Sequence, residues 1–131
     1  MQKEAEGAAQ AKAADKLSVL TCLAHIARRM GIEASVDTLM RRFGSIPDLL
    51  TPDLTASIAA GIGLEAKPLK VRWRDLPRLR RLLPAIMPLN DGTAVILDAV
   101  EEHPTAGLTA TLITPSATGD SRILVDERQL R

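Results

Sequence analysis

The chain has 131 residues, of which 46% are hydrophobic and 25% are charged, and its formal net charge is +1. This length corresponds to one domain, and the composition excludes a disordered, collagenous or coiled-coil chain. The near-neutral charge argues against a nucleic-acid partner, as does the shortage of aromatic residues, which are limited to Phe43 and Trp73. The single cysteine, Cys22, fits a reducing compartment, and no apolar run approaches the ~20 residues that insert into a bilayer.

The N-terminal region predicts a flexible tail followed by a helix. Residues 1–14 have almost no large apolar side chains, so they cannot bury enough surface to offset the entropy of ordering. Residues 15–30 place apolar side chains around nearly the whole circumference of a helix, and Asp15 and Gly31 suit its two ends. We therefore expect a central helix here, buried on most sides.

Two shorter helices are predicted next, at residues 36–43 and 52–61. Ser35 and Thr51 precede them as candidate N-cap residues. Pro52 opens the second of these helices, at the position where its missing N–H costs nothing. The first half of the domain is therefore expected to be helical.

After the third helix, the apolar residues follow an alternating pattern or short continuous runs, which predicts strands. A helical turn is expected at 74–83, a tight turn at 90–92 and a polar loop at 101–106. Strands are expected at 64–67, 85–89, 93–100, 107–114 and 121–125. Helices first and antiparallel strands later predict an α+β fold rather than a doubly wound α/β sheet.

Charge is distributed unevenly along the second half of the chain. Residues 64–81 hold seven basic and two acidic side chains, whereas residues 82–131 hold three basic and seven acidic ones. Clustered cations beside the only tryptophan suit an acidic or apolar unfolded segment. The candidate substrate-binding residues are Arg72, Trp73, Arg74, Arg78, Arg80 and Arg81. The alternative is two solvated surfaces of opposite charge, with Trp73 at the edge of the core.

Four stretches of sequence resemble the papain-like cysteine peptidases, and among them the bacteriocin-processing peptidase domain at the N-terminus of certain ABC exporters. They are Cys-Leu-Ala-His-Ile-Ala-Arg at 22–28, Leu-Thr-Pro-Asp-Leu at 50–54, Ala-Ala-Gly-Ile-Gly-Leu-Glu-Ala-Lys at 59–67 and Leu-Pro-Ala-Ile at 83–86. The resemblance covers nearly the whole of residues 15–131. It implies a papain-like peptidase-like domain, with three N-terminal helices packed on a four- to five-stranded antiparallel sheet.

The positions that carry catalysis in that family hold other residues here. By this resemblance, Ser18 occupies the nucleophile position, Lys12 that of the oxyanion glutamine, Thr93 that of the base histidine and Thr114 that of the aspartate. A thiol peptidase needs a thiolate, a base and an oxyanion donor, and threonine titrates far too high to serve as a base near neutral pH. The resemblance therefore implies a domain that is not an enzyme.

This pattern is similar to the degenerate peptidase-like domain of type I secretion ABC transporters, and most to the group that exports adhesins and repeats-in-toxin proteins. The resemblance implies a non-catalytic module at the cytoplasmic face of the bacterial inner membrane, which binds unfolded exported protein. The other partners it implies are the exporter's own transmembrane and ATPase domains, expected after Arg131. It implies no cofactor in this segment, because ATP belongs to the downstream region.

Two other interpretations are open at the level of the sequence. One is an active cysteine peptidase or another hydrolase that processes a leader peptide, and the other is a free-standing regulatory fold. A peptidase would use Cys22, yet the apolar helix around it predicts a buried thiol with a normal or raised pKa. His25 is expected to be solvated or bonded to the backbone, and His103 to lie on the surface. Because these side chains do not cluster, no metal site is predicted.

Overall fold

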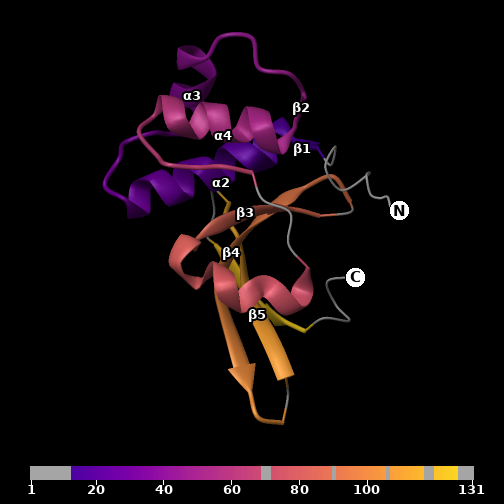
Figure 1. Cartoon of the computed structure of the whole chain (residues 1–131). Helices are drawn as coiled ribbons and strands as arrows, with labels where there is room; N and C mark the ends of the chain where they lie inside the picture. The colour runs from indigo at the N-terminus through magenta and orange to yellow at the C-terminus, as the bar shows by residue number, and fades with distance from the viewer. Residues whose placement is uncertain (1–12, 69–71, 90, 106, 117–119, 127–131) are drawn as a thin grey trace.

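The computed structural model describes residues 13–68, 72–89, 91–105, 107–116 and 120–126, and Figure 1 shows how its elements are arranged. Their order confirms the α+β class. The helices are α2 (Lys16–Arg29), α3 (Val36–Arg42), α4 (Pro52–Gly61) and the 3₁₀-helix η1 (Trp73–Leu82). The strands are β1 (Ala14–Asp15), β2 (Leu49–Leu50), β3 (Ala85–Pro88), β4 (Ala94–His103), β5 (Gly107–Thr114) and β6 (Ser121–Val125).

The three α-helices begin and end within one residue of their predicted bounds. Asp15, Ser35 and Thr51 each accept a hydrogen bond from the backbone N–H three residues further on, so each caps the helix that it precedes. Gly31 and Gly44 follow α2 and α3 with φ angles of 81° and 63°, which glycine adopts without the strain of a side chain. Local capping therefore fixes the lengths of these helices.

Strands β3 to β6 form one antiparallel sheet in that order. The predicted polar loop at 101–106 is partly wrong, because residues 101–103 extend β4 and pair with β5. Their polar side chains are exposed, and this hairpin projects away from the α-helices (Figure 1), so pairing there buries no charge. A change of register between Leu97 and Ala99 marks a β-bulge in β4.

Two further predictions differ from the structure. Ala14, assigned to the tail, is only 1% exposed and pairs with Leu50 in a small sheet of β1 and β2, while residues 1–12 lie outside the described residues. The strand predicted at 64–67 is wrong, because these residues pair with no other described strand. A strand needs a partner edge, and this segment instead leads from α4 toward η1 (Figure 1).

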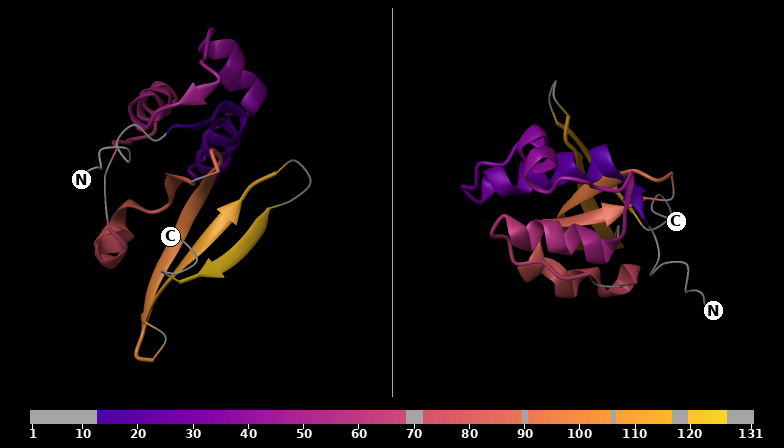
Figure 2. Two further views of the ribbon diagram at one scale, coloured as in Figure 1. Left: turned by 90° about the vertical axis from the view of Figure 1, so that its right-hand side faces the viewer. Right: turned by 90° about the horizontal axis from the view of Figure 1, so that it is seen from above.

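Each face of the larger sheet carries its own apolar cluster. Ala94 and Ile96 of β4 pack against the α-helices, whereas the alternate residues Val95 and Leu97 belong to a second cluster with η1. Helix α2 is central as predicted, and its Leu20 side chain is fully buried. Figure 2 shows α2, α3 and α4 together at one end of the sheet, with η1 beside the other part. The sheet therefore joins two halves of the domain, an α-helical half and a half that contains η1.

A close contact joins the end of α3 to the end of α4. The Nη2 atom of Arg42 donates to the carbonyl oxygen of Gly61 at 2.7 Å, and the Arg42 guanidinium lies 5.7 Å from the centre of the Phe43 ring. A Cβ atom at Gly61 would lie 2.7 Å from two carbons of that ring. The absence of a side chain at position 61 thus allows Phe43 to pack there.

We expect Gly61→Ala to lower the free energy of unfolding by about 1 kcal/mol, because overpacking outweighs the gain in helix propensity. Urea unfolding followed by circular dichroism measures this change. In a Phe43→Leu background the same substitution should be neutral or stabilising, since the smaller side chain leaves room for the methyl group. An equal loss in both backgrounds would contradict the proposed clash.

Candidate functional site

Ser18, on the first turn of α2, is tied to the first residue of β4. Its Oγ atom accepts a hydrogen bond from the Ala94 N–H at 2.6 Å and donates one to the Ala94 carbonyl oxygen at 3.0 Å. A serine hydroxyl has a single proton, so this donation uses the proton that a base would remove from a nucleophile. In this position the hydroxyl acts as a structural bridge between helix and strand.

Cys22 lies one turn further along α2, and its Sγ atom is 3.6 Å from the same carbonyl oxygen of Ala94. The side chain is fully buried, and burial raises the pKa of the thiol to about 12. The predicted burial and the predicted normal or raised pKa are both confirmed. At neutral pH the thiol is therefore protonated and shielded from solvent, unlike the thiolate of a cysteine peptidase.

We expect Cys22 to react with Ellman's reagent far more slowly in the native protein than in denaturant, because the thiolate is scarce and unreachable while the chain is folded. The release of the coloured thiolate in buffer and in concentrated guanidinium measures both rates. Fast labelling of the folded protein would contradict this expectation and would favour the peptidase interpretation.

The two threonines assigned to the missing base and aspartate lie at the end of the sheet that faces α2. Thr93 directly precedes Ala94, but its Oγ1 atom donates to the Asp91 carboxylate at 2.6 Å and so closes the turn after β3. Thr114 ends β5, one step beyond the residue that pairs with Ile96. Both side chains are exposed. Ser18 therefore meets the backbone beside Thr93 and not a base, and Lys12 lies outside the described residues.

The polar side of α2 is held by acidic side chains from the sheet. Arg29 Nη1 lies 2.6 Å and Arg122 Nη1 lies 2.8 Å from the two carboxylate oxygens of Asp98. Partial burial alone would raise the pKa of Asp98, but the hydrogen bonds from these arginines hold it below its usual value. His25, predicted to be solvated or bonded to the backbone, is instead only 12% exposed, with its Nδ1 atom 3.2 Å from the side-chain oxygen Oδ2 of Asp120.

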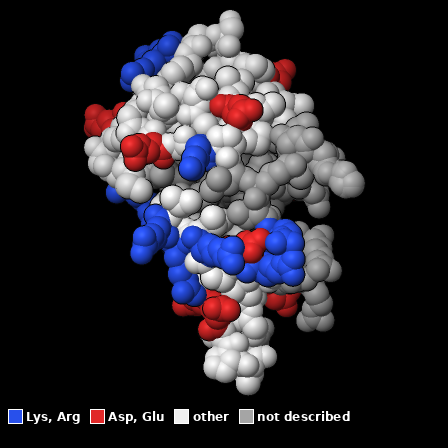
Figure 3. Space-filling view, viewed as in Figure 1, with Lys and Arg blue, Asp and Glu red and all other residues white. Residues whose placement is uncertain are grey.

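A cleft of ≈ 2100 Å³ lies between the α-helical half and η1 among the described residues. Its lining includes apolar side chains of α2 and β3, small residues of α4 and charged residues of η1. Figure 3 shows Lys and Arg side chains gathered in a band at the height of η1. The cleft therefore combines an apolar interior with a basic margin.

Four of the six candidate binding residues line this cleft, namely Arg72, Trp73, Arg74 and Arg81. Arg78 does not, although it is exposed on the same helix. Arg80 also lies outside the cleft, and its Nε atom donates to the Val100 carbonyl oxygen of β4 at 3.3 Å. The sequence thus predicts the helix that borders the cleft, and the structure shows which of its arginines line the cleft and which lie outside it.

The position of Trp73 combines features of both interpretations that the sequence leaves open. The ring is half-buried and packs against the apolar cluster under η1, yet it also lines the cleft. Leu82, 54% exposed, lines the cleft from the other end of η1. The apolar lining of the cleft was not predicted from the sequence, although the apolar circumference of α2 was a signal that could have located it.

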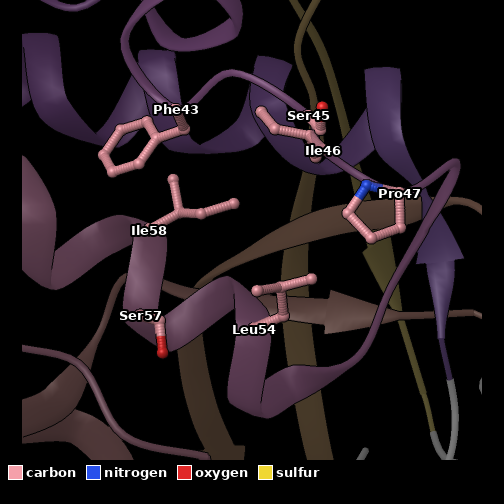
Figure 4. Close-up of a pocket in the computed structure, with 7 residues that line it drawn as sticks. All are labelled: Phe43, Ser45, Ile46, Pro47, Leu54, Ser57 and Ile58. Atoms are coloured by element: carbon pink, nitrogen blue, oxygen red, sulfur yellow. The ribbon is translucent and has the colours of Figure 1, made fainter.

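A second, smaller pocket of ≈ 160 Å³ lies between α4 and the loop that follows α3. In Figure 4 the side chains of Phe43, Ile46, Leu54 and Ile58 surround a common space, whereas Ser57 points away from it. No charged side chain lines this pocket. Its size suits a single apolar side chain, and its lining offers no chemistry for catalysis.

Comparisons with known proteins gave no significant match: no family model fits the chain, and neither curated proteins nor solved structures resemble it closely enough to place it. Within the described residues, none of the helices has both the length and the apolar character needed to span a membrane. The described His, Cys, Asp and Glu side chains also form no group of three that could hold a metal ion.

Proposed function

We propose that this chain is a papain-like, catalytically inactive recognition domain of a type I secretion ABC exporter, and that it binds exported protein while that protein is unfolded. In this proposal the domain acts at the cytoplasmic face of the bacterial inner membrane. The natural chain continues past Arg131 into transmembrane and ATPase parts, which bind the ATP. The exported protein belongs to the adhesin or repeats-in-toxin type.

The cleft beside η1 is the observation that carries the proposal. It has a volume of ≈ 2100 Å³ and combines apolar lining with exposed arginines, so it suits unfolded polypeptide more than a compact small molecule. The basic side chains raise the association rate of an acidic chain, and apolar contacts stabilise the chain once it is bound. Because a mobile chain loses entropy when it docks, binding should be weak and sensitive to salt.

The arrangement around Ser18 supports the absence of catalysis. Its hydroxyl donates to a backbone carbonyl, the described residues place no histidine beside it, and the neighbouring thiol of Cys22 is buried with a raised pKa. Hydrolysis needs an activated nucleophile, which neither side chain provides. No observation favours the alternative of an active peptidase strongly enough to propose it as well.

The substitution Arg74→Glu tests the binding site, with Arg78→Glu as its matched control. The probe is a permanently unfolded synthetic polypeptide rich in Asp and Glu, titrated against the whole chain while the emission of Trp73, the only tryptophan, is followed. We expect Arg74→Glu to weaken binding about tenfold at low salt and much less at high salt, because Arg74 lines the cleft and Arg78 does not.

Arg78→Glu changes the net charge equally on the same helix, so it should weaken binding only slightly. Equal losses in the two variants would show attraction by overall charge rather than a site in the cleft. No binding of the wild-type chain at low salt would contradict the recognition function itself. Melting temperatures of both variants should stay near that of the wild type, because both arginines are exposed.

A further inference from the structure

Strand β3 is an edge strand that lines the cleft. In the larger sheet it pairs with β4 on one side only, and no other described strand pairs with its second side. Its residues Ala85, Ile86, Met87 and Pro88 all line the cleft. An edge strand carries backbone donors and acceptors that can pair with a further chain. The cleft therefore contains a backbone template as well as side chains.

The hydrogen-bond pattern identifies which backbone groups of β3 face the cleft. The Leu89 N–H donates to the Thr93 carbonyl oxygen at 2.8 Å, which makes this facing pair a hydrogen-bonded one. Antiparallel pairs alternate, so Met87 is bonded to β4, whereas the N–H and C=O of Ile86 point to the opposite side. Pro88 offers only its carbonyl there.

The same alternation can be checked at the facing residue of β4. It predicts that the backbone groups of Ala94 point away from β3, and both of them are in fact bonded to Ser18 Oγ at 2.6 and 3.0 Å. The assignment of outward-facing groups on Ile86 therefore rests on two independent parts of the hairpin.

The charges of the cleft define the chemistry of a chain that lies along this edge. Four cationic side chains line it, Lys67, Arg72, Arg74 and Arg81, against two carboxylates, Glu65 and Asp75. Asp75 is already 3.3 Å from the Nε atom of Arg72, so the margin has a surplus of positive charge. Accessible apolar side chains also line it, among them Met30 and Leu82, which are 55% and 54% exposed, and the half-buried Ile86 and Met87 of β3.

We infer that the cleft takes its ligand as an added strand on the outer edge of β3, and that this ligand alternates apolar and acidic side chains. Side chains of a strand point alternately to its two faces, so one set meets the apolar interior while the other meets the arginines. This inference rests on the proposed function, because it states how unfolded polypeptide binds in that cleft. It adds a requirement on the order of residues that acidity alone does not impose.

Two peptides of identical composition test the requirement on order. One is acetyl-Leu-Asp-Val-Asp-Leu-Asp-Val-amide, and the other is acetyl-Leu-Val-Leu-Val-Asp-Asp-Asp-amide. Each is titrated against the whole chain at concentrations where the peptide is monomeric, and the emission of Trp73 reports binding. We expect the alternating peptide to bind about tenfold more tightly, because only its order satisfies both surfaces at once.

Backbone N-methylation then tests strand addition directly. In a strand, alternate N–H groups point to the same side, so only one alternate set can face β3. We expect methylation of one set in the alternating peptide to abolish measurable binding, and methylation of the other set to change the affinity less than threefold. Both methylated peptides carry the same side chains and the same charge, so each controls for the other.

The outcomes separate this inference from the proposed function. Equal affinity of the alternating and block peptides, or equal effects of the two methylation patterns, would overturn strand addition. In that case, binding that still depends on Arg74 would leave the recognition function intact. If neither peptide nor the longer unfolded polypeptide binds, both the inference and the proposed function fail.

Discussion

Replacing Ser18 by alanine should lower the free energy of unfolding by about 1–2 kcal/mol. The hydroxyl satisfies both the N–H and the C=O of Ala94, which is 3% exposed. Removing it leaves the Ala94 N–H without a partner at the junction of α2 and β4, while the Ala94 carbonyl oxygen keeps only the weak contact with Cys22 Sγ at 3.6 Å. A buried group without a partner costs about 1–3 kcal/mol, and some relaxation toward solvent keeps the loss in the lower part of that range.

Thr21→Ala is the matched control for this substitution. Thr21 lies on the same helix, and its hydroxyl donates only to the Leu17 carbonyl oxygen one turn earlier, at 2.7 Å. Its loss should change stability by no more than about 0.5 kcal/mol, because that carbonyl already has a partner in the helix. Urea unfolding of both variants measures the difference. A loss for Ser18→Ala as small as for Thr21→Ala would show that the bridge to β4 contributes little.

The same bridge shows which part of the site geometry the sequence could not supply. The resemblance assigned Ser18 and Thr93 to one site, and the structure places Ser18 against the residue after Thr93. No signal in the sequence indicated the hydrogen-bond partners of the Ser18 and Thr93 side chains. The Thr93 hydroxyl bonds Asp91, two residues earlier in the turn, because a nearby carboxylate is the strongest acceptor within reach.

Local signals predicted the helices well because capping is a short-range interaction. Ser35 and Thr51 lie within three residues of the groups that they cap, so the sequence alone reveals them. Strand pairing depends on distant residues, which is why β1 and β2 were missed: Ala14 meets Leu50 across two helices. The alternating residues 64–67 failed for the same reason, since alternation predicts a strand only where an edge is available to pair with it.

The basic segment was predicted as one surface because sequence distance does not resolve the two sides of a short helix. Arg74 and Arg78 are four residues apart, yet only Arg74 lines the cleft. Arg78 lies in the middle of η1, whereas Arg74 and Arg81, which both line the cleft, lie near its two ends. This difference is what makes the two arginines a useful pair of variants.

Replacing Asp98 by alanine should lower the free energy of unfolding by about 2 kcal/mol at neutral pH. The carboxylate is mostly buried and accepts hydrogen bonds from Arg29 of α2 and Arg122 of β6, so it links the central helix to β4 and β6 of the sheet. Hydrogen bonds to charged groups contribute about 1.5–3 kcal/mol, and the partial exposure of both arginines reduces their net effect.

Asp48→Ala is the matched control for Asp98→Ala. The Asp48 carboxylate is 99% exposed and contacts only Lys16, at 3.6 Å, among the described residues. Its replacement should lower the free energy of unfolding by less than about 0.5 kcal/mol.

The dependence on pH separates the charge of Asp98 from its packing. Its pKa in the folded chain lies below the ordinary value of 3.8, so the folded state favours the ionised form. The stability that this gives is fully present above the unfolded pKa and is lost as the pH falls through the folded value. The wild type should therefore lose more stability than Asp98→Ala on acidification, and the gap between them should narrow below about pH 4. Chemical unfolding of both proteins at neutral pH and across the acid range measures this gap. A gap that stays constant with pH would mean that Asp98 stabilises the domain by packing, and that its ion pairs with Arg29 and Arg122 contribute nothing.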